Sequence, residues 1–286
     1  MQKKVIITAA LSGATTLKEH NSAVPYTAQE FAEEAARCYA AGAAMVHMHA
    51  RLDDGTPTHD IDRIRATHDA IKEKTPELIV NLSSAVGRGK TPEQRIAPIA
   101  SIKPEMASLN TNSMNFAAIN WKTGEIVNDY LFDNTFYMLQ DFSRAMEENG
   151  TKPEIEVYDM GGLDNVKLIM KQGMFSDPMN FNFVMGVHGG AHFRADLFAA
   201  LVNALPPGAN FTACGVGRDE FPTIMQSALM GGHMRVGLED NVRLPNGALA
   251  KGSYELVKYA VMTSEVLGRD PATPDEAREI MGIRKK

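Results

Sequence analysis

Residues 44–51 read Ala-Met-Val-His-Met-His-Ala-Arg and lie between two segments with helical periodicity, Ala28–Ala41 and Ile61–Lys74. The stretch is short and largely uncharged, as expected of a strand buried beneath a layer of helices. The same alternation of strand and helix continues in both directions along the chain. The other predicted strands are Val5–Leu11, Leu78–Ser84, Met106–Thr111, Pro153–Asp159, Phe181–Val187, Asn210–Val216 and His233–Asp240. The other predicted helices are Pro92–Ser101, Phe136–Asn149, Leu163–Lys171, Arg194–Ala204, Pro222–Met230 and Ser253–Leu267.

This alternation predicts an α/β fold in which the strands close into a (β/α)8 TIM barrel. Eight strands that are each followed by a helix close a parallel barrel, whereas doubly wound sheets usually stop at about five to seven strands. The length of 286 residues suits one such barrel. We therefore expect a single domain over residues 1–286, with a short helical extension from Pro274 and an insertion at Trp121–Asn134 after the fourth strand.

Composition and charge limit the partners and the compartment. A net charge of -6 argues against a nucleic-acid partner, because neutralising phosphates needs a basic surface. The two cysteines, Cys38 and Cys214, show no metal-binding spacing and are interpreted as buried small side chains in a reducing compartment. Lys3 and Lys4 before the apolar run Val5–Leu11 resemble a secretory signal, but the run is too short. With no apolar stretch of membrane-spanning length either, a cytoplasmic protein is predicted.

The histidines of the opening stretch are the first candidates for chemistry. Because side chains alternate along a strand, His47 and His49 point to one face, and the apolar Val46 and Met48 point to the other. Imidazoles that face into a barrel are expected at a metal site, since neutral imidazole is a common zinc ligand. A pair of hydrogen-bonded core histidines would explain the same pattern.

The predicted eighth strand ends in two carboxylates, Glu239 and Asp240, at the carboxyl end of the barrel, where active sites of this fold lie. Strand alternation places Arg235 and Glu239 on one face. Glu239 would complete a three-ligand site with one open position, as in catalytic zinc centres. Two histidines and a carboxylate also describe non-haem iron sites, so the ligands leave the metal open. The alternative for Glu-Asp-Asn is a polar turn that closes the strand.

Several segments together resemble the signatures of the beta-keto acid cleavage enzymes. They are Leu11–Ala14, Val46–Arg51, Pro104–Asn110, Pro153–Asp159, Gly215–Arg218, Gly231–Asn241, Ala272–Pro274 and Glu276–Arg278. The resemblance extends over nearly the whole chain. It implies a metal-dependent barrel that reacts a beta-keto acid with acetyl-CoA to give acetoacetate and a new acyl-CoA.

The resemblance also implies roles for single residues. His47, His49 and Glu239 match the ligands of the metal, which is zinc in the best-known member, although another divalent ion would suit them too. The ion would act as a Lewis acid on the substrate oxygens. Asp240 matches the general base that removes the proton between the two carbonyls. An aspartate beside a cation should have a pKa below its ordinary value, which keeps it ionised and limits its basicity.

Four further positions match the family's active site or its substrate-binding hydroxyls. Arg235 matches the arginine that orients and tunes the base, and a structural ion pair is the alternative or additional reading. Glu156 should be paired or protonated if buried, which favours an active-site role. Ser83 and Ser108 match hydroxyls that bind the substrate or the acyl group, and Ser108 replaces a threonine while keeping the donor.

One mismatch bears on the substrate. The family member that acts on 3-keto-5-aminohexanoate carries a glutamate for the substrate ammonium where this chain has Thr15. An ammonium without a counter-ion loses a charge-assisted hydrogen bond and still has to be desolvated. We therefore predict a substrate with a neutral side chain, with Glu19 as the nearby acidic residue that could replace the missing charge.

The glycine-rich segments Gly186–Gly190 and Gly215–Arg218 follow the sixth and seventh strands, where barrel loops often expose backbone N–H groups to phosphate. We predict that Arg218 binds the phosphates of acetyl-CoA there; tight turns also use glycine for conformational reasons alone. The resemblance further implies a homo-oligomer, commonly a tetramer.

Other functions fit parts of this pattern. A metal-dependent aldolase or lyase would use the same ion without a thioester. An amidohydrolase-type hydrolase fits less well, because its His-x-His belongs on the first strand and needs further strand-end lysine or histidine ligands. A barrel that binds a small molecule without catalysis is the third alternative. Dependence on acetyl-CoA separates the first of these from the transferase.

Overall fold

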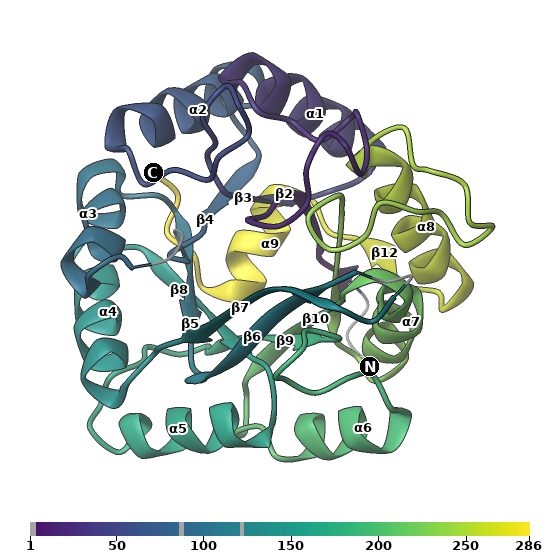
Figure 1. The fold of residues 1–286 in the computed structure, drawn as a ribbon. Coiled ribbons are helices and arrows are strands. Elements are labelled where there is room, and N and C mark those ends of the chain that lie inside the picture. The colour runs from purple at the N-terminus through teal and green to yellow at the C-terminus, as the bar shows by residue number, and fades with distance from the viewer. Residues whose placement is uncertain (1–3, 86–88, 121–122) are drawn as a thin grey trace.

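A computed structural model describes residues 4–85, 89–120 and 123–286 and confirms the predicted (β/α)8 TIM barrel (Figure 1). The parallel barrel strands follow one another round the barrel in chain order, and β11 closes the ring on β2. These strands are β2 Ile7–Ser12, β3 Met45–Met48, β4 Ile79–Leu82, β5 Met106–Asn110, β8 Lys152–Val157, β9 Asn180–Met185, β10 Asn210–Gly215 and β11 His233–Val236. The helices between and after them are α1 Ala28–Ala41, α2 Ile61–Lys74, α3 Pro92–Ile102, α4 Phe136–Glu148, α5 Met160–Met170, α6 Ala195–Asn203, α7 Glu220–Leu229 and α8 Ser253–Val266.

The strand boundaries differ from the predicted ones mainly at the carboxyl ends. The predicted strand Ala44–Arg51 stops at Met48, and the predicted strand His233–Asp240 stops at Val236. At Gly237 the chain leaves the sheet with φ 147°, and a Cβ there would lie 2.2 Å from the backbone oxygen of Ala10. The strand prediction was therefore wrong beyond Val236, because this close approach turns the chain into the loop that follows.

Two helices begin earlier than predicted. α5 begins at Met160 because the Asp159 side chain accepts a hydrogen bond from the backbone N–H of Gly162 and caps the helix. α7 begins at Glu220, directly after the short 3-10 helix η1 Gly217–Asp219. Both changes lengthen the helix at its amino end and leave the order of elements as predicted.

The amino end of the barrel is closed by the last part of the chain. The two-stranded pair β1 Lys4–Val5 and β12 Asp270–Pro271 lies outside the barrel, so Val5 does not belong to the first barrel strand. The predicted terminal helix is α9 Pro274–Met281. Its buried face packs on residues at the starts of the barrel strands, among them Ile6, Met45 and Met106. Here the His233 Nδ1 accepts a hydrogen bond from the backbone N–H of Ile6 at 3.0 Å, and burial lowers the pKa of His233 to about 3.

The insertion after β5 is longer than Trp121–Asn134 and forms an antiparallel hairpin, β6 Met114–Ile119 and β7 Ile126–Phe132. Trp121 lies outside the described residues. Met114 and Phe132 pack on Tyr158 and on residues from the carboxyl ends of β9 and β10. The hairpin therefore crosses the carboxyl end of the barrel, in front of the strands in Figure 1.

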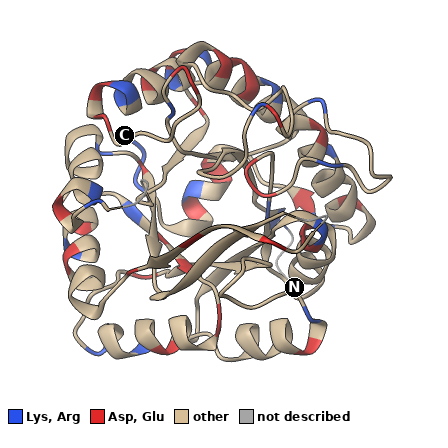
Figure 2. Cartoon of the chain, in the orientation of Figure 1, with Lys and Arg blue, Asp and Glu red and all other residues tan. Residues whose placement is uncertain are grey.

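The core lies between the barrel and the surrounding helices. As predicted, Val46 and Met48 join the cluster that also contains Phe31 of α1 and Ile64 of α2. Figure 2 shows Lys and Arg interspersed with Asp and Glu on the outer helices. Among the described residues, no helix has the length and apolar character needed to cross a membrane.

Candidate metal centre and active site

The two histidines and Glu239 come together inside the carboxyl end of the barrel. Nε2 of His47 lies 3.7 Å from Oε2 of Glu239, and Nε2 of His49 lies 3.4 Å from Oε1 of the same carboxylate. All three side chains are largely enclosed: His47 is 1% exposed and Glu239 has 14% of its side chain exposed. His49 lies just after β3, and its imidazole still reaches the same side as that of His47.

This arrangement fits a small divalent ion. Two ligands held 2.0–2.1 Å from a tetrahedral metal lie about 3.3 Å apart, close to the separations between the imidazoles and the carboxylate. Within the described residues, Glu239 Oε2, which faces Nε2 of His47, is buried without a hydrogen-bond partner. Buried polar atoms are normally paired, so an unpartnered carboxylate oxygen in a three-ligand cluster points to a ligand that completes the site.

The charge states also suit metal binding. Burial lowers the pKa of His47 well below its ordinary value, so its imidazole is neutral and can donate a lone pair. Burial alone would raise the pKa of Glu239. The charge of Arg235 outweighs burial and holds that pKa well below its usual range. The cluster therefore presents a neutral His47 nitrogen and an ionised carboxylate.

The loop after β2 holds the ligand carboxylate from the other side. A Cβ at Gly13 would lie 2.4 Å from Cγ of Glu239, so only glycine fits beside that side chain. The hydroxyl of Thr16 donates to the backbone oxygen of Glu239 at 2.9 Å. The buried Arg51 ties the loop down through Ser12 Oγ and the backbone oxygens of Gly13 and Thr16. The sequence predictions did not include this support, which arises only when the first and last strands pair.

The turn that carries Glu239 and Asp240 is held by a second buried carboxylate. Glu220 accepts hydrogen bonds from the backbone N–H of Gly237 at 3.1 Å and from Nδ2 of Asn241 at 2.8 Å. Glu239 and Asp240 thus lie in a turn, and strand alternation does not describe them. That is why both of these neighbouring carboxylates can reach Arg235.

Arg235 bonds three carboxylates at once. Its guanidinium donates to Asp240 twice, from Nε at 2.9 Å and from Nη2 at 3.0 Å. It also donates to Glu239 Oε1 at 2.7 Å and to Glu156 Oε1 at 3.1 Å. Only 3% of the Arg235 side chain is exposed. The predicted Arg235–Asp240 pair is therefore present, and the same arginine also contacts the candidate metal ligand.

Burial and neighbouring side chains set the pKa of the Asp240 carboxyl in the protein alone. Burial, together with the charge of Glu239, outweighs Arg235 and raises the pKa of Asp240 to about 6. A carboxylate with this pKa is a stronger base than an exposed aspartate and is still mostly ionised at neutral pH. The effect of burial could not be read from the sequence, because it depends on the loops that cover the residue.

Glu156 is buried and paired, as expected. Its second oxygen lies 3.2 Å from the Tyr158 hydroxyl, which also lies 2.9 Å from Asn110 Oδ1 and can donate its one hydrogen to either oxygen. One layer deeper, Glu154 accepts from Nδ2 of Asn81 at 2.6 Å. Burial and the charge of Glu156 raise the pKa of Glu154 to about 8. Tyr158, Asn81 and Asn110 were not among the predicted site residues, although their alternation with outward apolar residues could have suggested them.

The predicted substrate and coenzyme residues lie in different surroundings. Ser83 and Ser108 are buried near the ends of β4 and β5, and Ser108 Oγ accepts a hydrogen bond from the backbone N–H of Ser84 at 3.1 Å. Thr15 is exposed on the loop after β2. Arg218 has 88% of its side chain exposed and lies 3.9 Å from Asp219. The structure thus brings together the candidate metal ligands with Arg235, Asp240 and Glu156. It leaves the roles of Ser83, Ser108, Thr15 and Arg218 open to proposal.

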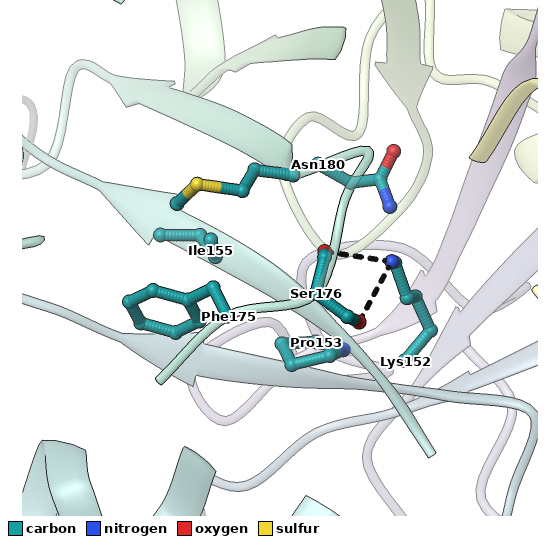
Figure 3. A pocket seen from close by; sticks show the side chains of 7 residues that line it. Lys152, Pro153, Ile155, Phe175, Ser176 and Asn180 are labelled. Atoms are coloured by element: carbon teal, nitrogen blue, oxygen red, sulfur yellow. Dashed lines mark hydrogen bonds between the residues drawn. The ribbon is translucent and has the colours of Figure 1, made fainter. Parts of the chain in front are cut away.

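A separate small pocket lies at the opposite end of the barrel, beside the start of β8 (Figure 3). Lys152 lines it, and its ammonium already donates to the backbone oxygen and to Oγ of Ser176 at 3.0 and 3.2 Å. The pocket is lined otherwise by mostly apolar side chains. Its lining contains none of the residues of the candidate metal centre.

Fold and site together define a (β/α)8 barrel enzyme with a candidate metal centre at its carboxyl end. The family model of the beta-keto acid cleavage enzymes matches residues 4–283. The chain therefore belongs to the beta-keto acid cleavage enzymes.

Two relatives agree with this assignment, and a solved structure agrees with the fold. The chain is 44% identical over 285 residues, covering 100% of both proteins, to the 3-keto-5-aminohexanoate cleavage enzyme of Fusobacterium nucleatum subsp. nucleatum. It is 32% identical over 286 residues, 99% of this chain and 96% of the relative, to the 3-oxoadipate:acetyl-CoA acetyltransferase of Cupriavidus necator. The structure titled "Binary complex of ObcA with oxaloacetate" matches with a TM-score of 0.72 at 23% identity, over 91% of this chain and 67% of that one. At this identity the last match supports the fold alone.

Proposed function

We propose that this enzyme condenses a beta-keto acid with acetyl-CoA to give acetoacetate and a new acyl-CoA, with a divalent ion, zinc by preference, on His47, His49 and Glu239. One observation carries the proposal: the Arg235 side chain hydrogen-bonds both Glu239 of the ligand cluster and the buried Asp240. Family membership and the acetyl-CoA in the name of the Cupriavidus necator relative support it.

The cluster and the pair have complementary tasks. A bound divalent ion would supply Lewis-acid stabilisation of the negative charge that develops on the substrate oxygens. Asp240 would take the proton from the carbon between the two carbonyls, and burial of its carboxyl group favours holding that proton. Arg235 holds both oxygens of Asp240, so it fixes the direction of the carboxylate before the substrate enters.

The remaining steps conserve atoms without a further reactant. The substrate carbanion attacks the thioester carbonyl of acetyl-CoA, and the CoA thiolate leaves. The thiolate then attacks the original acyl carbonyl, the bond to the central carbon breaks, and reprotonation gives acetoacetate. Ser83 and Ser108 are the proposed hydroxyl donors to the acyl oxygens, and Glu156 is proposed to hold Arg235 during these steps. Arg218 is the proposed phosphate contact, because it lies exposed after β10 at the same end of the barrel.

The substrate side chain is proposed to be neutral. The 44% identical Fusobacterium nucleatum relative is named for an amino substrate, so overall similarity alone would favour an ammonium. Thr15 supports the neutral side chain, because it offers no charge on the loop that packs against Glu239. Glu19 is exposed and lies 3.7 Å from His20, which does not direct it to the ligand cluster.

We also propose a domain organisation, a compartment and an oligomeric state. We propose one barrel domain over the whole chain, consistent with the family match over residues 4–283. Both cysteines are free and buried, as suits a cytoplasmic protein. A homotetramer is proposed from the resemblance to the family, and size-exclusion chromatography with light scattering tests it.

The function is tested by incubating zinc-loaded enzyme with a panel of beta-keto acids, with and without acetyl-CoA, and following acetoacetate and acyl-CoA by mass spectrometry. Acyl-CoA should form only with acetyl-CoA, and it should disappear in His49→Ala. The matched control is His68→Ala, because His68 lies on the outer helix α2 with Asp69 as its partner. Cleavage without acetyl-CoA would instead support a metal-dependent aldolase.

A further inference from the structure

The imidazole of His47 has a second side that the candidate metal centre does not use. Its Nε2 faces Glu239 at 3.7 Å, while its Nδ1 lies 4.0 Å from Oε2 of Glu154. Nδ1 of His47 and Oε1 of Glu154 are both buried and have no hydrogen-bond partner among residues 4–85, 89–120 and 123–286. Nδ1 of His47 therefore lies beside the carboxyl group of Glu154, and each group keeps hydrogen-bonding capacity that no described residue uses.

The position of Glu154 is fixed by a hydrogen bond to the same oxygen that lies nearest His47. Nδ2 of Asn81 donates to Oε2 of Glu154 at 2.6 Å, which directs that oxygen within the barrel interior. Asn81 is the strand partner of His47 across β3 and β4, and it is fully buried. Glu154 itself is 1% exposed. The carboxylate is thus enclosed in the layer beneath the ligands, and no contact with solvent explains its presence there.

We propose that Glu154 is a positioning residue that accepts the Nδ1–H of His47, fixes the tautomer of this imidazole and thereby directs Nε2 toward the metal. Metal-bound histidines commonly give their other ring N–H to a carboxylate, and losing that partner typically weakens metal binding 10- to 100-fold. The 4.0 Å separation needs a shift of about 1 Å to reach hydrogen-bond length. The inference rests on the proposed metal centre. It adds a residue that touches neither the metal nor the reacting atoms.

The proposal also accounts for a feature that packing does not explain. Three buried carboxylates in this region contact Arg235, namely Glu156, Glu239 and Asp240. Glu154 has no such ion pair in the described part of the chain, and its nearest basic partner is His47. A buried carboxyl group is costly in either protonation state unless it is hydrogen-bonded, so a hydrogen bond with the imidazole gives a reason for its place.

The test measures Zn²⁺ binding to the metal-stripped full-length enzyme by competition with a chromophoric chelator. In Glu154→Gln the dissociation constant for Zn²⁺ should rise 10- to 100-fold, and the visible absorption of the Co²⁺-loaded protein should change because ligand geometry changes. Glu34→Gln is the matched control. Glu34 is also a buried glutamate, but it lies on α1 and bonds the backbone of Tyr254 and the side chain of Arg37.

The outcomes separate the two proposals. If Glu154→Gln binds Zn²⁺ within about twofold of the wild type and the Co²⁺ spectrum is unchanged, the positioning role is wrong while the metal centre stands. If the wild type does not bind Zn²⁺ or Co²⁺, the metal centre fails and this inference fails with it. Should Glu154→Gln not fold, Glu154→Asp decides: it keeps the charge on a shorter side chain, and wild-type Zn²⁺ affinity in it would overturn the proposal.

Discussion

Replacing Arg235 with methionine should destabilise the metal-free enzyme strongly. The substitution keeps an unbranched side chain in the barrel and removes the four hydrogen bonds to Asp240, Glu239 and Glu156. Removing one partner from a buried ionic cluster costs about 3–5 kcal/mol, because the remaining charges stay buried without compensation. Three carboxylates are left here, so the expected loss in the free energy of unfolding at pH 8 lies at the upper end of that range.

The loss should depend on pH in a defined direction. Burial has already raised the folded-state pKa of Asp240 from 3.8 to about 6, and removing Arg235 raises it further. A carboxyl group with a raised folded-state pKa destabilises the folded protein at higher pH, and this destabilisation decreases as pH falls through that pKa. The difference between wild type and Arg235→Met should therefore be smaller at pH 5 than at pH 8.

Urea unfolding followed by circular dichroism, with a chelator present, measures both effects. Arg278→Met is the matched control, since Arg278 is a buried arginine that bonds Glu105 at the amino end, at 2.6 and 2.9 Å. It should lose stability and keep its Zn²⁺ affinity. A loss below about 1 kcal/mol in Arg235→Met at pH 8 would refute the argument that buried charge compensation holds this site together.

Four further changes test single parts of the account. Gly13→Ala should weaken Zn²⁺ binding about tenfold or more, because its Cβ would lie 2.4 Å from Cγ of Glu239; unchanged affinity in a chelator competition would contradict the tight fit. Thr15→Glu should raise the ratio of kcat/KM for 3-keto-5-aminohexanoate over a neutral analogue roughly tenfold, and a constant ratio would remove Thr15 from specificity. Arg218→Ala should raise the KM for acetyl-CoA, whereas an unchanged KM would withdraw the phosphate contact. Because the buried His233 binds its proton only when the protein is unfolded, the wild type should lose up to about 1.4 kcal/mol of unfolding free energy per pH unit as pH falls from 6.5 toward about 3. His233→Gln should remove this contribution, and equal pH slopes in the two proteins would disprove it.

The barrel could be predicted because its signal is local and repeated. Each apolar strand is followed by an amphipathic helix, and helix starts carry their own marks, such as the Thr27 and Glu30 capping box at α1. The strand ends were harder, because they depend on contacts between distant segments. Gly237 shows this: its turn is fixed by the backbone of Ala10 on β2, which is far away in the sequence.

Some residues of the candidate site could likewise be predicted from the sequence, and others could not. His47 and His49 could be paired from strand alternation alone, and Glu239 could be added from the place of active sites in barrels. The low exposure of Asp240 and the contact of Glu154 with Asn81 could not be predicted, since they follow from how loops and strands far apart in the chain meet. The raised pKa of Asp240 in the protein alone is likewise a result of the fold that the sequence could not predict.

The most direct test of the proposed function follows the label from acetyl-CoA with both acetyl carbons carrying ¹³C. The enzyme is incubated with an accepted beta-keto acid, and carbon NMR locates the label in the products. The account predicts that the acetyl half of acetoacetate, the keto and methyl carbons, carries both labels and that the acyl group of the new acyl-CoA carries none. Unlabelled acetoacetate, or label in the acyl group of the new acyl-CoA, would contradict it.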